Sequence, residues 1–375
     1  MADAGLYIHV PFCARACPYC DFDFQVGRTP ATRAYLAGLE REVVMRLSEE
    51  TRAEAWPTVY LGGGTPSLLG ADGLRELGGW ISRRFPGAGA DEYTIEVNPE
   101  HATVELAAAI REIGGTRVSL GVQTLDPAGL AALGRVHSAD AARAAIGVMR
   151  DAGLGVSADL IVGWPGQTHA GLAEDVAAIV GAGAQHVSVY ALTVEAGTPW
   201  ETLVRRGRRR LPDPDHQADL LVASESALEA AGLPHYEVAS YGPAARHNLG
   251  YWTWRDYVGL GPSAHSARYG ADGSVERRGN RRGLATWLAD PSAGEREQLD
   301  ALAAAVEGLW TGLRYLPGID VAAYLARFSA VDRAWIAART RRQQERGNLE
   351  LGPEVLRVAP GRWLWHDAIA ADLLA

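Results

Sequence analysis

The chain of 375 residues contains no lysine, so arginine supplies all 36 of its basic side chains. With 45 acidic residues the formal charge is −9, which argues against a dedicated nucleic-acid binder. No apolar run approaches the roughly 18 residues that a transmembrane helix needs. The start of the chain also lacks the basic segment and cleavage site of a signal peptide. We therefore expect a cytoplasmic protein without a transmembrane segment, and peripheral membrane association stays open.

Cysteine is equally scarce, because the chain has only Cys13, Cys17 and Cys20. An odd number of cysteines within eight positions is a poor disulfide framework. The three follow a predicted strand that ends at Val10, and three thiolates on one loop can converge on a metal centre. Two hypotheses fit: a tetrahedral zinc site completed by His9, or a 4Fe–4S cluster with one iron open to an exogenous ligand. The ligands of zinc loops usually come as C-x2-C pairs, whereas the three cysteines here have the spacing C-x3-C-x2-C. The cluster is therefore the stronger hypothesis.

From the cysteine loop to about residue 195, apolar strand-like runs alternate with helical patterns, such as those over Arg33–Arg52 and Ala139–Ala152. Six strand–helix units in a row predict a parallel sheet with right-handed crossovers. Six units are too few for a closed eight-stranded barrel, so we expect an α/β fold with an open, partial (β/α)6 barrel. The predicted strands are Leu6–Val10, Thr58–Leu61, Tyr93–Val97, Arg117–Val122, Val156–Val162 and His186–Leu192.

The sequence predicts three domains: a barrel over residues 1–195, an α/β extension over 196–290, and a smaller C-terminal domain over 291–375. The last is mostly helical with a short β stretch, so we expect a winged-helix-like lid or docking module. Within the extension, the glycine- and arginine-rich segment Gly270–Gly283 predicts an exposed loop. The run Arg205–Arg210 predicts a solvated surface loop, with contacts to porphyrin propionates or an acidic partner as the alternative.

Unusual residues follow the predicted strands at their carboxyl ends, where the site of such a barrel lies. Gly62–Gly64 precede Thr65 and are not a phosphate loop, because no Gly-Lys-Ser/Thr follows. Their use would be a close approach of the backbone to a ligand. Glu96 and Asp159 lie within apolar strands, where a single polar residue usually makes an interior hydrogen bond. Several such residues at one rim predict a shared pocket.

The spacing C-x3-C-x2-C, with Tyr19 before the last cysteine, and the Gly-Gly-Gly-Thr-Pro run resemble the radical S-adenosylmethionine (SAM) superfamily. The resemblance implies that Cys13, Cys17 and Cys20 hold a 4Fe–4S cluster whose open iron is chelated by SAM. It also implies that one electron from the cluster cleaves SAM, so that the cofactor carries the difficult chemistry. The side chains that would line the SAM-binding surface are Tyr7, Tyr19, Gly63, Gly64, Thr65, Glu96, Gln123, Arg135 and Asp159.

Within that superfamily the chain resembles the coproporphyrinogen-oxidase-like branch, and most closely the HemW-type haem chaperones. The similar stretches are residues 6–13, 96–99, 117–123, 133–137, 159–163, 247–252 and 256–261. The resemblance implies haem binding and delivery to an acceptor protein that the sequence does not identify. His247, in the stretch His-Asn-x-x-Tyr-Trp, would be the haem-iron ligand. A core histidine hydrogen-bonded within the second domain is the alternative.

Two enzymes of similar pattern remain as alternatives. The oxygen-independent coproporphyrinogen III oxidase, which converts propionates to vinyl groups, resembles C-x3-C-x2-C-x-C and has a longer segment before its cysteines. Here Phe22 occupies the place of the fourth cysteine, and only twelve residues precede Cys13. A radical SAM methyltransferase or cyclopropanase would share the same motifs. Whether the chain is an enzyme therefore stays open at this point.

Overall fold

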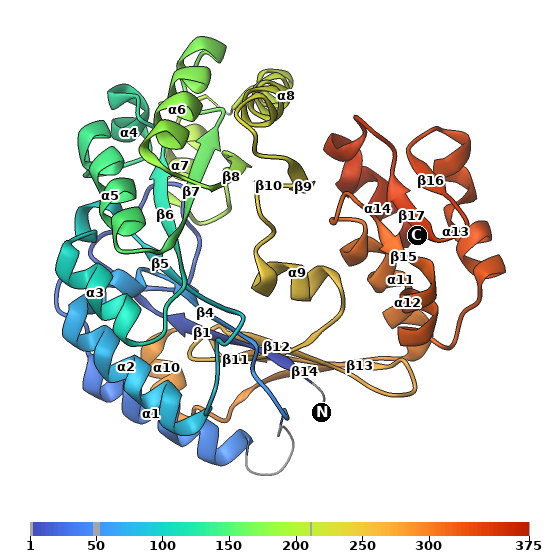
Figure 1. The fold of residues 1–375 in the computed structure, drawn as a ribbon, viewed down its shortest axis with the longest axis horizontal. Helices are drawn as coiled ribbons and strands as arrows, with labels where there is room; N and C mark the ends of the chain where they lie inside the picture. Colours follow the sequence, from blue (N-terminus) through green and yellow to red (C-terminus); the bar gives the residue numbers. More distant parts are fainter. Residues whose placement is uncertain (1–2, 48–52, 211, 375) are drawn as a thin grey trace.

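The computed structural model describes residues 3–47, 53–210 and 212–374, and its centre is a twelve-stranded sheet (Figure 1). Seven neighbouring strands, β11, β1 and β4–β8, are parallel, and antiparallel strands flank them on both sides. The sheet ends in two separate edges, so the expected α/β fold with an open, partial barrel is confirmed. In spatial order the strands are β14 (Gly294–Leu299), β13 (Val275–Asn280), β12 (His265–Tyr269), β11 (Asp256–Leu260), β1 (Ala4–Val10), β4 (Thr58–Gly63), β5 (Glu92–Val97), β6 (Arg117–Gln123), β7 (Gly155–Val162), β8 (His186–Ala191), β10 (Ser240–Tyr241) and β9 (His235–Glu237).

The helices that connect the parallel strands cover the outer face of the sheet (Figure 1). Their ends follow local signals: the Ser138 hydroxyl accepts the backbone N–H of Ala141 at 3.2 Å, and Gly153 has a φ of +76°. The predicted helix at residues 33–52 is confirmed up to Arg46, and its last five positions lie outside the described residues. The helices are α1 (Thr32–Arg46), α2 (Gly70–Arg84), α3 (Val104–Glu112), α4 (Pro127–Ala132), α5 (Ala139–Asp151), α6 (His169–Ala182), α7 (Pro199–Arg205) and α8 (Pro214–Ala230), with short 3-10 turns η1 (Pro66–Leu69) and η2 (Pro99–His101).

The two faces of the parallel strands differ in polarity, because successive side chains point to opposite faces. On β1, Leu6, Ile8 and Val10 are fully buried and belong to the main apolar core. Between them, the Tyr7 and His9 side chains contact each other through Tyr7 Oη and His9 Nδ1, 3.2 Å apart. The barrel strands thus combine an apolar outer face with polar groups on the inner face, where a ligand site can form.

Strands from the second half of the chain widen this sheet at both edges. The prediction that Gly270–Gly283 is an exposed loop is wrong, because Val275–Asn280 form β13. β13 pairs with β14, a strand that the sequence pattern did not reveal. Charged side chains also pair across these strands, as in the ion pair between Arg277 Nη2 and Glu297 Oε2 at 2.7 Å. The division at residues 195 and 290 into domains stays a prediction.

The C-terminal unit is mostly helical and has its own apolar core. A three-stranded sheet, β15 (Ile319–Asp320), β17 (Val355–Val358) and β16 (Leu349–Leu351), supplies the expected β stretch. Within the described residues, none of the helices is long and apolar enough to cross a bilayer. The remaining elements are β2 (Phe12–Cys13), β3 (Gln25–Val26), α9 (Arg246–Trp252), α10 (Leu284–Ala289), α11 (Ala301–Gly312), α12 (Val321–Arg327), α13 (Arg333–Glu345), η3 (Trp363–Trp365) and α14 (His366–Leu374).

A buried carboxylate joins α1 to the segment that carries β11–β13. Glu42 is 0% exposed and accepts hydrogen bonds from the backbone N–H of Gly261 at 2.8 Å and from Asn280 Nδ2 at 2.7 Å. The indole N–H of Trp287 donates to the same carboxylate at 3.1 Å, and Arg46 forms an ion pair with it. Residues that are more than two hundred positions apart in sequence thereby become one rigid unit.

Candidate functional site

The three cysteines lie on the loop that leaves β1 at the carboxyl edge of the sheet. The turn after β4 packs against the base of this loop, because Gly64 N donates to Val10 O at 2.9 Å and Thr65 N donates to Phe12 O at 2.7 Å. A Cβ atom on Gly64 would lie 2.8 Å from Phe12 O, so glycine is required there. The close approach predicted for a ligand is thus made by the chain itself. Contact of Gly63 and Gly64 with SAM stays a prediction.

The three thiols are free and partly exposed. Cys13 Sγ lies 3.3 Å from Thr65 Oγ1, and Arg135 Nη1 donates to Cys17 Sγ at 3.6 Å. Burial raises the pKa of Cys13, against the opposing effect of the Thr65 hydroxyl, and burial raises the pKa of Cys20 to about 11. Coordination to a metal cation deprotonates a thiol and compensates for this cost. Three unpaired thiols on one loop, with a cation and a hydroxyl beside two of them, fit an iron–sulfur cluster.

The geometry disfavours the alternative in which His9 completes a zinc site. His9 Nε2 lies 2.8 Å from Asp23 O, and Nδ1 lies 3.2 Å from Tyr7 Oη, so both ring nitrogens are engaged. Among the residues that the structure describes, no three His, Cys, Asp or Glu side chains converge closely enough to hold one metal ion. A 4Fe–4S cluster does not need such convergence, because its thiolates bind different iron atoms.

Arg135 connects the cysteine loop to the ends of two strands. Its Nη2 donates to Asn98 Oδ1 at 2.8 Å, after β5, and to Gly121 O at 2.9 Å, within β6. Nearby, Gln123 has a φ of +67°, at a shift in the register between β6 and β7. Such a conformation is costly for a residue other than glycine and is frequent at functional sites. Asn98 follows β5 in the stretch 96–99 and was not among the residues predicted to line the SAM-binding surface.

Two predicted carboxyl groups lie deeper, on the inner face of the sheet. Glu96 accepts hydrogen bonds from Tyr60 Oη at 2.9 Å and from Gly63 N at 3.1 Å. Asp159 accepts hydrogen bonds from the Ser119 hydroxyl at 3.1 and 3.2 Å. Burial raises the pKa of Glu96 to about 7, with the charge of Asp159 adding to the rise, and burial raises the pKa of Asp159 to about 6. The site therefore holds two carboxyl groups that titrate near neutral pH. Tyr60 was not predicted as a site residue, because a tyrosine within an apolar strand gives no signal of its own in the sequence.

We expect Glu96→Gln to stabilise the cofactor-free protein at pH 8 by about 3 kcal/mol and to leave its stability at pH 4 nearly unchanged. The folded-state pKa of Glu96 is raised, so the folded state binds the proton more tightly and loses stability as pH rises from about 4 to 7. Glutamine removes this titration, while its oxygen can accept from Gly63 N–H and its amide can donate to Tyr60. Urea unfolding at both pH values measures the difference. The exposed Glu105→Gln is the control, and an equal gain at both pH values would contradict the argument.

Aromatic side chains hold the cysteine loop from its other side. Tyr19 packs against a small apolar cluster that includes Leu133 and the fully buried Trp200 of α7. The backbone N–H of Trp200 donates to Pro18 O at 2.8 Å. The arginine run Arg205–Arg210 begins at the last residue of α7 and is exposed except for Arg209. The Arg209 guanidinium lies 4.6 Å from the centre of the Trp200 ring. The prediction of a solvated loop agrees with this exposure, and contact of the run with propionates stays a prediction.

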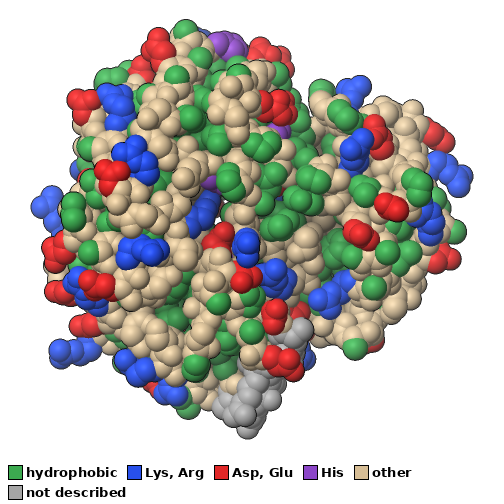
Figure 2. Space-filling model, viewed as in Figure 1, with side chains coloured by type: hydrophobic (Ala, Val, Ile, Leu, Met, Phe, Trp, Pro, Cys, Tyr) green, Lys and Arg blue, Asp and Glu red, His purple; other side chains and the backbone are tan. Residues whose placement is uncertain are grey.

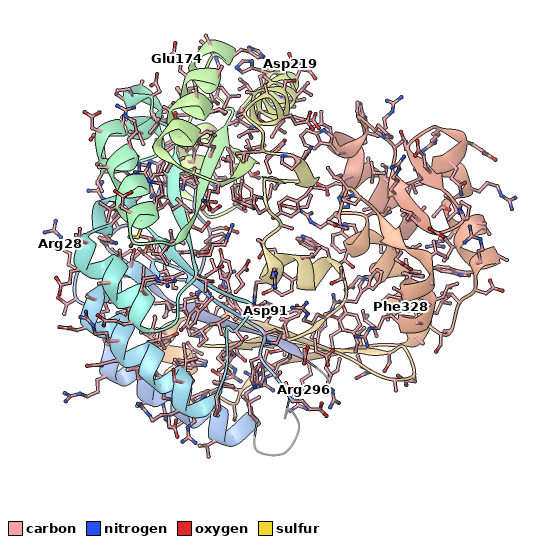
Figure 3. The ribbon with its side chains drawn as sticks, viewed as in Figure 1. Arg28, Asp91, Glu174, Asp219, Arg296 and Phe328 are labelled. Atoms are coloured by element: carbon pink, nitrogen blue, oxygen red, sulfur yellow. The ribbon has the colours of Figure 1, made fainter. Side chains whose placement is uncertain are left out.

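His247 lies at the opposite end of the barrel from the cysteines. Its Nδ1 is 2.9 Å from Thr58 Oγ1, and its backbone N–H donates to Glu92 Oε1 at 3.0 Å, at the first residues of β4 and β5. At the same end of the barrel, Asp91 (labelled in Figure 3) forms an ion pair with Arg246, the first residue of α9. β1 runs from the His247 end to the cysteine loop over a span of about 17 Å for five residues. His247 and the three cysteines therefore lie at opposite ends of β1.

The inner face nevertheless connects the two ends. The His247 ring packs against the Tyr60 ring with centroids 5.4 Å apart, and Tyr60 donates to Glu96 near the cysteine loop. His247 itself is buried, and its Nε2 lies 2.8 Å from Tyr251 Oη. Both ring nitrogens are thus engaged within the chain, as in a core histidine. Its role as a haem ligand stays a prediction that requires one of these contacts to open.

Comparison with known proteins places this geometry in a family. The profile of the radical SAM superfamily matches residues 7–179. The heme chaperone HemW of Mycobacterium tuberculosis is 43% identical over 70% of this chain and 68% of its own length, and that of Bacillus subtilis is 34% identical over 69% of each. The structure of the coproporphyrinogen III oxidase HemN of Escherichia coli has the same fold, with a TM-score of 0.82, 20% identity and coverage of 99% of this chain and 89% of HemN. The chain belongs to the HemW heme chaperone family of the radical SAM superfamily.

Proposed function

We propose that this chain is a haem chaperone that holds a 4Fe–4S cluster and SAM at the carboxyl ends of the barrel strands and passes haem to an acceptor protein. The observation that carries the proposal is the 43% identity, over 70% of the chain, with a protein named as a heme chaperone. Membership of the radical SAM superfamily implies the cluster and SAM. The proposal specifies the acceptor only as a protein that itself binds haem.

Cys13, Cys17 and Cys20 would hold the cluster. When bound, a 4Fe–4S cluster supplies one-electron transfer and an iron that is open to SAM. The guanidinium of Arg135 lies 3.6 Å from Cys17 Sγ, and the Thr65 hydroxyl lies 3.3 Å from Cys13 Sγ. These two groups would stabilise thiolate charge and orient the sulfur atoms, as outer groups of metal sites commonly do.

SAM would occupy the rim between this loop and the inner face of the sheet. Its sulfonium and ammonium groups are cationic, and the carboxyl groups of Glu96 and Asp159 supply negative charge on that face when they ionise. Gln123 and Arg135 would meet its polar groups from the ends of β6 and α4. The full set proposed for SAM is Tyr7, Tyr19, Gly63, Gly64, Thr65, Glu96, Gln123, Arg135 and Asp159.

Haem would bind near α9, which lies between the barrel and the C-terminal unit (Figure 1). Figure 2 shows hydrophobic side chains gathered on this face over β9 and β10, and an apolar surface suits the porphyrin ring. Burial, with the charge of Arg255 adding to it, lowers the pKa of His247 to about 3. The imidazole is therefore neutral at physiological pH and needs no deprotonation to bind iron.

If His247 is the haem ligand, we expect His247→Ala to weaken haem binding by about tenfold or more and to shift the Soret band. Tyr251→Phe is the informative partner variant, because it removes the hydroxyl that occupies Nε2 and should leave haem binding equal or tighter. Haem titration followed by absorbance measures both, and circular dichroism checks the fold. An unchanged Soret band and affinity in His247→Ala would remove His247 as the ligand.

The oxidase alternative is tested by product formation. Phe22 is 65% exposed on the cysteine loop, at the position where the oxidase pattern has a fourth cysteine. The cluster is reconstituted without oxygen, and reductant, SAM, coproporphyrinogen III and a one-electron acceptor for the substrate radical are added. The tetrapyrrole is then followed by mass spectrometry. We expect the porphyrin to remain intact in the presence of a confirmed cluster. Stepwise loss of two carboxyl groups as carbon dioxide would overturn the chaperone as the main role.

A further inference from the structure

The segment that leaves the cysteine loop is tied to distant parts of the chain through Asp23. Asp23 Oδ2 accepts hydrogen bonds from the Ser263 hydroxyl at 2.8 Å and from Gly283 N at 2.7 Å. The backbone oxygen of the same residue lies 2.8 Å from His9 Nε2. Three contacts from three different segments therefore hold a residue that lies three positions after Cys20.

A second tie lies between Cys20 and Asp23. Arg282 Nη2 donates to the backbone oxygen of Asp21 at 2.9 Å, from the turn that also supplies Gly283. On the other side, Cys20 N donates to Cys17 O at 3.3 Å, which joins the last two cysteines through the backbone. The exit of the cysteine loop is thus held at both Asp21 and Asp23 by the turn over residues 280–283.

The turns that contact Asp23 are themselves held by hydrogen bonds. Ser263 has a φ of +58°, a conformation that residues other than glycine keep only when their surroundings enforce it. Its backbone N–H donates to Arg281 O at 3.1 Å, and Asn280 N donates to Ala264 O at 2.9 Å. These turns are fastened to α1 through Glu42, which accepts from both Gly261 N and Asn280 Nδ2. Asp23 is therefore connected through these turns to α1.

We propose that Asp23 is a positioning residue of the iron–sulfur site. It holds the exit of the cysteine loop against the turns at residues 261–264 and 280–283, so that Cys20 is in place before iron binds. A metal site needs its ligands held in position by neighbouring hydrogen bonds, and an untied loop spends binding free energy on ordering itself. This inference rests on the proposed cluster and gives the segment after residue 255 a part in that site.

The first test is amide hydrogen exchange on the full cofactor-free chain. We expect Asp23→Ala to raise exchange over residues 20–26 about tenfold, because the carboxylate that accepts two hydrogen bonds is lost. Asp21→Ala is the matched control, since it removes the same charge closer to Cys20 from an exposed side chain that makes neither of these bonds. Asp23→Asn keeps an acceptor oxygen and should restore most of the protection. Ser263→Ala removes only one of the two hydrogen bonds and should raise exchange over residues 20–26 by a smaller factor. This variant tests the same contact if Asp23→Ala does not fold.

The second test measures retention of the cluster. After reconstitution and desalting, iron and sulfide should leave Asp23→Ala several-fold faster than the wild type or Asp21→Ala when a chelator is added. Exchange that is unchanged in Asp23→Ala would overturn the tie itself. Faster exchange with wild-type iron retention would overturn the positioning role. A wild-type chain that retains no iron would overturn the proposed cluster, which distinguishes that failure from the other two.

Discussion

Cys17→Ser is expected to abolish retention of the 4Fe–4S cluster, so that iron and sulfide fall to background after reconstitution. The chain contains only three cysteines, so no other thiol can replace the lost one. A serine hydroxyl gives up its proton far less readily than a thiol and is a poor ligand for an iron–sulfur cluster. Cys17 is also the thiol that accepts a hydrogen bond from Arg135 Nη1 at 3.6 Å.

Ala16→Ser is the matched control for this prediction. It adds the same hydroxyl at the neighbouring exposed position of the loop and leaves all three thiols in place. Because Cys17 is itself partly exposed, the cofactor-free Cys17→Ser protein should unfold at nearly the same urea concentration as the wild type. Wild-type iron content in Cys17→Ser would contradict the assignment. One zinc per wild-type chain without sulfide would restore the zinc hypothesis.

Glu42→Ala is expected to lower the free energy of unfolding by about 3–5 kcal/mol. The side chain is fully buried on α1, and its removal leaves Arg46 as an uncompensated buried charge. It also leaves the hydrogen-bond donors of Gly261, Asn280 and Trp287 without their acceptor, and each unsatisfied donor adds to the cost. Urea unfolding followed by circular dichroism measures the change.

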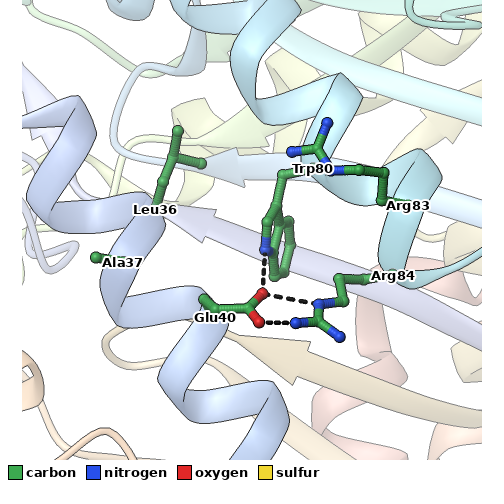
Figure 4. Close-up of a pocket in the computed structure, with 6 residues that line it drawn as sticks. All are labelled: Leu36, Ala37, Glu40, Trp80, Arg83 and Arg84. Carbon is green, nitrogen blue, oxygen red and sulfur yellow. Dashed lines mark hydrogen bonds and ion pairs between the residues drawn. The ribbon is translucent and has the colours of Figure 1, made fainter.

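Glu40→Ala is the control on the same helix. Glu40 lies in an open groove between α1 and α2, where it accepts from Trp80 Nε1 at 2.9 Å and pairs with Arg84 (Figure 4). The Glu40 side chain is 35% exposed and that of Arg84 is 42% exposed, so water can replace much of the interaction. We expect a loss of about 1 kcal/mol or less. Equal losses in the two variants would contradict the argument from burial.

Much of the fold could be predicted from the sequence, because it depends on local patterns. The alternation of Leu6, Ile8 and Val10 with polar neighbours marks a strand whatever lies around it. The Ser138 cap likewise marks the start of α5 from local hydrogen bonding alone. The charged strands β13 and β14 have no such apolar signal, because their side chains are mostly polar or charged and they are joined by a backbone ladder.

The sequence by itself determined six of the seven parallel strands, the loop that carries three thiols, and membership of a family. Only the tertiary structure decided which residues meet. It placed His247 at the amino ends of the strands, away from Cys13, and it brought Asp23 to Ser263 across 240 positions. The physical reason is that strand and cap signals arise within a few neighbouring residues, whereas these contacts depend on which sheet edges and turns come together. A single sequence carries no local pattern for such pairings.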